Sequence, residues 1–162
     1  MLSLKANWEA LQEAKKEIDN FIDNANADVF VGFKSGQQHT IKQKDGEDKS
    51  IDMSELARML TFGAHGIPER PFLQEGILSK KKELQKEIET QWSNIRQKKK
   101  ANWNKLGTKA VAAVQEFVRG DYYKTHAPNS PATIREKGSN TPLIDTGEMI
   151  NSLVYVVEGG DK

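Results

Sequence analysis

The sequence predicts a single α+β domain, residues 1–162, in which a small antiparallel β-sheet packs against a long helical hairpin and a shorter N-terminal helix. Apolar residues recur at helical spacing in the first 25 residues and again between residues 71 and 118. Short β-branched stretches lie near residue 30 and near the C-terminal end. The length, with 36% hydrophobic residues, suits one core, and no repeat or linker divides the chain.

The N-terminal third is expected to form one helix followed by a β-hairpin. One helical stripe collects the apolar residues Leu4, Trp8, Leu11, Ile18, Phe21 and Ile22. Alternation at Val29, Val31 and Phe33 then predicts a strand, which a turn at 34–37 joins to a second strand at 38–43. The polar segment 44–50 is expected to be a mobile loop at the end of this hairpin.

The middle of the chain predicts a short helix and then the long helical hairpin. Asp52-Met-Ser-Glu55 has the spacing of a capping box, so a short helix should run from about Met53 to Thr61. Pro71 suits the first turn of the next helix, which continues through a highly charged stretch to residues 98–100. A further helix should follow and end at Gly120, whose position suits a C-terminal cap.

The C-terminal part predicts an ordered loop, a short helix and a strand. Residues 121–142 are rich in Pro, Gly, Ser and Asn, but Ser130 to Gly138 reads as one or two capped helical turns. Asp145-Thr-Gly-Glu148 has the spacing of a second capping box. The strand-like segment 153–157 is expected to join the sheet of the hairpin.

One segment has a strong charge bias. Residues 79–105 carry nine Lys or Arg against three acids, a net charge of +6, while the remainder of the chain is −5 and the whole is +1. The basic face predicted there includes Lys80, Lys81, Lys82, Lys98, Lys99 and Lys100. It suits a solvated helix face, contact with the acidic surface of a neighbouring copy, or DNA passing through a channel. Because the whole chain is nearly neutral, we expect it to serve protein assembly more than DNA affinity.

No pattern of catalytic or ligand-binding residues stands out. There is no cysteine, and the three histidines, His39, His65 and His126, have no metal-ligand spacing. The carboxylates Asp19, Asp23 and Asp28 suit solvated element ends. The glycines Gly63, Gly66 and Gly76 form no phosphate loop, and Ser79, Ser130 and Ser152 lack a nucleophile elbow. We therefore expect no enzyme activity, metal or cofactor. No secretion signal or membrane span is predicted, and a cytoplasmic origin fits best.

Two blocks of sequence form a distinctive pair of motifs. The first is Ile67-Pro-Glu-Arg-Pro-Phe-Leu73 before a long helix. The second comprises Tyr122-Tyr123, the segment 127–135, Lys137-Gly138 and the segment 142–152. Together they resemble the virion-morphogenesis and tail-completion (neck) family of long-tailed bacteriophages. Both blocks occur in the order of the family, and the resemblance extends from roughly residue 29 to the C-terminus. Phe62-Gly-Ala-His-Gly66 departs from the His or Asn with Glu and Gly that members often carry there.

The resemblance implies a structural virion protein that is made in the host cytoplasm and assembles as a ring, expected to be hexameric. Its implied role is to join or complete the tail at the neck, between head-connector and tail proteins, with DNA passing nearby. A tail terminator that caps the tail tube is the nearest alternative. A DNA-contacting protein that uses the basic helix 79–105 is an alternative from another class.

The motif residues suggest either a subunit interface or an internal structural role. They are Arg70, Pro71, Phe72, Asp145, Thr146 and Gly147. Arg70 lies at a rigid helix start, from which a guanidinium can clamp a loop of its own chain or of a neighbour. If Arg70 is exposed in the monomer, its loss should impair assembly far more than folding. The turn at 145–147 is expected to order the final strand.

Overall fold

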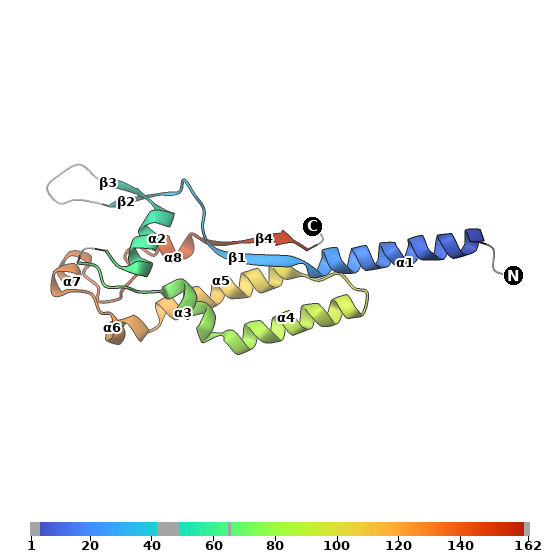
Figure 1. Ribbon diagram of the computed structural model, residues 1–162. Coiled ribbons are helices and arrows are strands. Elements are labelled where there is room, and N and C mark those ends of the chain that lie inside the picture. Colours follow the sequence, from blue (N-terminus) through green and yellow to red (C-terminus); the bar gives the residue numbers. More distant parts are fainter. Residues whose placement is uncertain (1–3, 42–48, 65, 161–162) are drawn as a thin grey trace.

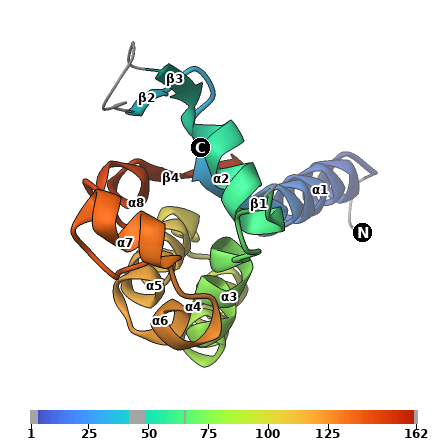
Figure 2. The ribbon, with the colours of Figure 1, turned by 90° about the vertical axis from the view of Figure 1, so that its left-hand side faces the viewer.

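The computed structural model describes residues 4–41, 49–64 and 66–160 and confirms the α+β class. Eight helices and four strands form within these ranges. Helix α5 (Trp103–Arg119) runs through the body. The sheet formed by β1 (Ala27–Phe33) and β4 (Leu153–Gly159) lies on one side of it, and α3 (Phe72–Ser79) and α4 (Lys81–Arg96) lie on the other (Figure 1). Figure 2 shows three short helices gathered around the end of α5 that lies away from α1 (Leu4–Ala25): α6 (Tyr122–His126), α7 (Pro131–Lys137) and α8 (Glu148–Asn151).

Helix α1 (Leu4–Ala25) is the longest helix of the described chain, with 22 residues, so the prediction of a shorter N-terminal helix is wrong. It projects from the body, as Figure 1 shows, and within the part of α1 whose side chains are described, its C-terminal half makes the contacts that anchor it. Asn24 makes this anchor: its side chain accepts the Ala101 N–H at 3.1 Å, and its carbonyl accepts the Trp103 indole N–H at 3.0 Å. Residues 11–23 of α1 are all exposed.

The strands form two separate antiparallel pairs: β1 (Ala27–Phe33) with β4 (Leu153–Gly159), and β2 (Gln38–Ile41) with β3 (Lys49–Asp52). The C-terminal strand thus joins β1 as predicted, but the predicted hairpin between the first two strands is wrong. Gly36 turns the chain at a φ of 81°, and its N–H donates to the Asp52 carboxylate at 2.8 Å. This contact directs β2 away from β1 and toward β3.

The segment 44–50 was expected to be a mobile loop. Residues 44–48 of it lie outside the described residues, whereas Lys49 and Ser50 belong to strand β3. Helix α2 (Met53–Phe62) follows directly, as predicted. Asp52 caps it by accepting the Ser54 N–H at 2.9 Å, but Glu55 binds Arg58 and does not complete the predicted capping box.

The helix predicted to start near Pro71 is divided at Lys80 into α3 (Phe72–Ser79) and α4 (Lys81–Arg96). The division lets α3 press against α5: a Cβ on Gly76 would lie 2.7 Å from the Val114 Cα, so only glycine permits this approach. Lys80, which lies between α3 and α4, forms an ion pair with Glu116 of α5 at 3.0 Å and so ties the point of division to that helix. The predicted helical hairpin is therefore formed by α4 and α5, and α5 ends at Gly120 as expected.

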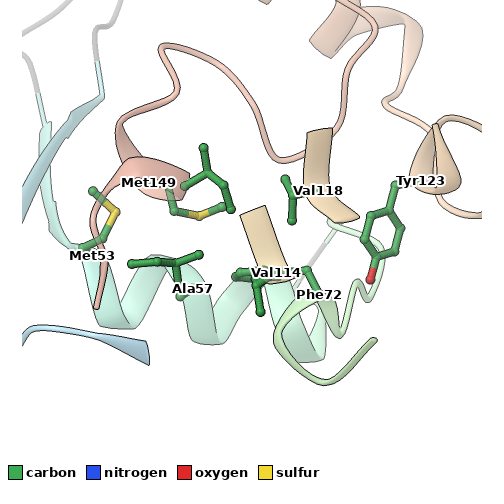
Figure 3. Packing of buried hydrophobic residues seen from close by; sticks show 9 residues of the cluster. Met53, Ala57, Phe72, Val114, Val118, Tyr123 and Met149 are labelled. Atoms are coloured by element: carbon green, nitrogen blue, oxygen red, sulfur yellow. The ribbon is translucent and has the colours of Figure 1, made fainter. Parts of the chain in front are cut away.

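The buried residues form two clusters along α5. The larger, in Figure 3, joins α2, α3, α5, α6, α8 and β4 through Met53, Ala57, Phe72, Val114, Val118, Tyr123, Met149, Ile150 and Leu153. The smaller joins both ends of α4 to the first half of α5 and the segment before it, through Leu84, Ile95, Ala101, Trp103, Leu106 and Ala110. A side chain as fully buried as Phe72 contributes about 1.5–3 kcal/mol, so the two clusters hold the sheet, hairpin and C-terminal loop as one body.

Candidate functional site

The first sequence block forms a rigid support for Arg70. Gly63 ends α2 at a φ of 74°, a conformation that favours glycine. Ala64 and Ile67 then form an isolated antiparallel bridge, and the Arg70 N–H donates to the Leu60 carbonyl at 2.9 Å. Pro71 follows at the N-cap of α3. The backbone of Arg70 is thus fixed from both sides.

The Arg70 side chain is buried, with only 4% of the residue exposed, and it holds a loop of its own chain. Its Nε donates to the Ala127 carbonyl at 2.9 Å, and an Nη donates to the Pro128 carbonyl at 3.1 Å. Burial lowers the pKa of Arg70, but an arginine remains charged at any physiological pH. Of the two roles that the sequence left open, the structure shows the internal clamp. The prediction that loss of Arg70 impairs assembly more than folding required an exposed Arg70. Because the loop covers the guanidinium, that requirement is not met.

The loop that Arg70 holds contains two short helices, and the second forms over the capped helical turns predicted between Ser130 and Gly138. Helix α6 (Tyr122–His126) packs its Tyr123 in the core, and the Tyr123 hydroxyl donates to Glu75 of α3, so burial and this carboxylate raise the pKa of Tyr123. Helix α7 (Pro131–Lys137) begins at Ser130, whose hydroxyl accepts the Thr133 N–H at 3.1 Å. It ends at Gly138, which has left-handed geometry, with a φ of 67°.

The second block forms a turn before the four-residue helix α8 (Glu148–Asn151). Gly147 is its N-cap at a φ of 81°, and the Thr146 hydroxyl accepts the Glu148 N–H at 3.3 Å. The predicted capping box is wrong, because Asp145 does not cap the helix. Glu148 reaches away from the turn instead, and its Oε2 lies 2.6 Å from His39 Nδ1 on β2.

The two sequence blocks meet in one cleft of about 580 Å³. Of the six predicted motif residues, four line it: Arg70, Asp145, Thr146 and Gly147. Phe72 is instead fully buried in the core beside Val114, and Pro71 begins α3. His39 and Glu148, which the sequence reasoning did not select, also line the cleft. Their pairing joins positions 109 residues apart, so no local pattern signals it.

One polar group in the wall of the cleft is unsatisfied among the described residues. Asn129 places its Oδ1 3.4 Å from an Arg70 Nη, and its buried Nδ2 has no hydrogen-bond partner. The cleft wall from Pro128 to Pro131 is therefore fixed mainly by Arg70 and by the cap of α7. The arrangement can present a fixed loop to another surface, but the described residues that line the cleft place no activated nucleophile beside a base.

The predicted basic face is not one surface. Lys80, Lys81 and Lys82 lie at the start of α4, whereas Lys98, Lys99 and Lys100 follow its end, about 24 Å away along a 16-residue helix. Lys80 is paired with Glu116 and Glu83, and Lys98 with Glu17 of α1 at 2.8 Å. Part of the basic segment therefore joins elements of its own chain.

The helical hairpin of α4 and α5 contains a buried polar network that was not predicted from the sequence. Glu87 and Gln91 are almost fully buried on α4, and Glu87 binds Lys109 and Lys105 of α5. The hydrogen bond from Lys109 is the main cause that holds the pKa of Glu87 below its usual value. Gln91 donates to Glu87 at 2.6 Å and accepts the Asn102 N–H at 2.7 Å. One sequence signal could have indicated this network. Glu87 and Gln91 are four residues apart and lie on the same helical face as the buried Leu84 and Ile95.

The described residues offer neither a cluster of metal ligands nor a helix suited to crossing a membrane. No group of three or more His, Cys, Asp or Glu within these ranges is arranged to hold a metal ion, and His65 lies outside them. Across the same part of the chain, none of the helices combines the length and the apolar character that a membrane crossing needs.

Comparison with known proteins does not place the chain in a family. No family model matches it, and neither the curated proteins nor the solved structures yield a significant match. The function must therefore be inferred from the motif residues and from the cleft in which they meet.

Proposed function

We propose that this protein is a structural component of a long-tailed phage particle, a neck or tail-completion protein that acts as a ring-forming adaptor at the head–tail junction. The observation that carries the proposal is that the two blocks resembling this family meet in one cleft around Arg70. In the proposed role, the protein is synthesised in the bacterial cytoplasm, takes no cofactor, catalyses no reaction and becomes part of the virion.

The build of the cleft supports a role in contact rather than in chemistry. Arg70 fixes the loop at 127–129, and Ser130 and Gly138 cap α7 at both ends, so the loop needs little further ordering when a partner binds. Binding to a preordered surface loses less conformational entropy, which suits a protein that joins head-connector and tail proteins.

Deleting the coding sequence from the phage that carries it tests the proposal. Negative-stain electron microscopy of the lysate should show DNA-filled heads and separate tails of normal length. Supplying the wild-type protein, or the surface variant Arg58→Ala as a matched control, should restore joined particles. Infectious particles of normal appearance without the protein would contradict the proposal.

The two alternatives predict different results in the same experiment. A tail terminator would leave tails of abnormal length, because the polymerising tube would lack its cap. A DNA-contacting protein would bind duplex DNA with an affinity that falls steeply with salt. The pairing of Lys80 and Lys98 within the chain favours the adaptor over the DNA-contacting protein.

A further inference from the structure

Two cations line the cleft without a carboxylate partner. Arg70 is almost fully buried, yet the acceptors of its hydrogen bonds are neutral oxygens of residues 127–129. Lys137, half-buried at the end of α7, donates to the Thr141 carbonyl at 3.1 Å, which is also neutral. Neither cation forms an ion pair with another described residue. Buried charges are normally paired, so the cleft has room for an anion that the chain itself does not supply.

The surroundings of both cations disfavour their charge. Burial lowers the pKa of Arg70, and burial is also the main cause that lowers the pKa of Lys137. Arg70 lies close enough to lower the pKa of Lys137 further, while Asp145 opposes this shift. An anion bound between the two cations would stabilise the charged form of each.

The carboxylates of the cleft do not cancel these charges. Glu148 is exposed, and its Oε2 lies 2.6 Å from His39 Nδ1. Asp145 is exposed as well. The cleft is therefore positive in its buried part and negative at its exposed positions. The two exposed carboxylates repel a phosphate with two negative charges more strongly than a group with one, which favours a carboxylate as the ligand.

The wall of the cleft also holds a third donor. Nδ2 of Asn129 is buried and has no partner among the described residues, and Oδ1 of the same side chain lies at the long distance of 3.4 Å from Arg70 Nη2. A rotation that turns Nδ2 toward the cleft therefore gives up one weak contact. A planar carboxylate has two acceptor oxygens, which suits a site with donors from Arg70, Lys137 and Asn129.

We propose that the cleft binds a carboxylate group of a partner protein between Arg70 and Lys137, with Asn129 as a third donor. The clamp on the loop uses Nε and Nη2 of Arg70, which leaves Nη1 for the partner. The contact specifies the chemistry that the cleft recognises. That the carboxylate belongs to a head-connector or tail protein rests on the function proposed above.

A peptide titration of the isotope-labelled full chain, followed by NMR, tests the site. Acetyl-Ala-Glu-Ala-amide offers a side-chain carboxylate, acetyl-Ala-Ala-Ala with a free C-terminus offers a main-chain carboxylate, and acetyl-Ala-Gln-Ala-amide offers none. The side-chain amide signals of Asn129 and the backbone signals of Lys137 and residues 145–147 should shift and saturate with a carboxylate probe. The tighter of the two identifies the source of the group, and the glutamine peptide should leave the signals unchanged.

Three variants separate the site from a general effect of charge. Lys137→Met removes one cation of the cleft and should weaken carboxylate binding by about tenfold or more. Asn129→Ala keeps both hydrogen bonds from Arg70 to the backbone of the loop and should also weaken binding. Lys124→Met is the matched control, because Lys124 pairs with Asp121 outside the cleft and its loss should leave the affinity unchanged. Circular dichroism should show native helix content for all three.

Several results would overturn the site. They are the absence of a saturable shift with either carboxylate probe, equal shifts with the glutamine peptide, tighter binding of inorganic phosphate than of both carboxylate probes, and wild-type affinity in Lys137→Met. The titration uses purified protein alone, so its failure leaves the deletion experiment untouched. Conversely, normal particles after the deletion would reject the virion role while the carboxylate site could still be measured.

Discussion

The internal clamp formed by Arg70 predicts that Arg70→Ala destabilises the isolated chain. The change removes two hydrogen bonds from a charged donor to the Ala127 and Pro128 carbonyls, each worth about 1.5–3 kcal/mol. Pro128 is exposed, so water can reach part of the opened loop and the expected loss is about 2–4 kcal/mol. For a chain of this size, the melting temperature should fall by about 5–15 °C.

Thermal unfolding followed by circular dichroism measures this effect. Arg58→Ala is the control, because Arg58 forms an exposed ion pair with Glu55, and solvent screening leaves such a pair with little effect on the melting temperature. Hydrogen exchange should also rise at residues 127–131 in the Arg70 variant. Unfolding at the wild-type temperature, combined with loss of assembly, would show that Arg70 acts between subunits and would refute the clamp.

Three further predictions follow from the packing, the buried carboxylate and the charge distribution. Because the hydrogen bond from Lys109 holds the pKa of Glu87 below the usual value of a glutamate, about 4.5, this carboxylate stabilises the fold above about pH 4.5 and ceases to do so as the pH falls through its lowered pKa. Urea unfolding at pH 7 should show Glu87→Gln to be less stable by about 1–3 kcal/mol, with a weaker loss of stability in acid than the wild type; an unchanged acid profile would contradict this role. Gly76→Ala should cost about 1–3 kcal/mol by pushing α3 off Val114, whereas the control Gly32→Ala meets no atom within 4 Å; equal stability of the two variants would exclude the close contact. Duplex DNA should bind only weakly at physiological salt in a fluorescence anisotropy titration, and tight binding that is lost on reversing Lys98, Lys99 and Lys100 would contradict that prediction.

Elements that depend on local signals were predictable from the sequence. Helices α2, α5 and α7 follow from apolar periodicity and from caps at Asp52, Ser130 and Gly138, which the structure confirms. The C-terminal strand follows from its run of β-branched residues. Each of these signals acts within a few residues, so no knowledge of the tertiary fold is needed to interpret it.

The errors arose where a distant contact decides the local structure. Glu148 has the position of a capping-box residue, but it pairs with His39 of β2. The division at Lys80 depends on the close packing of Gly76 against Val114. The same is true of the candidate site: the sequence selected Arg70 and the turn at 145–147, but the burial of Arg70 depends on a loop 57 residues away.

The location of the protein in the virion is the most direct test of the proposed function. Purified phage particles can be labelled with a gold-conjugated antibody against the chain and imaged by electron microscopy. The proposal predicts label at the head–tail junction, at an equal number of copies on every particle. Particles that lack the protein, or that carry it only on the head shell or at the far end of the tail, would contradict the proposal.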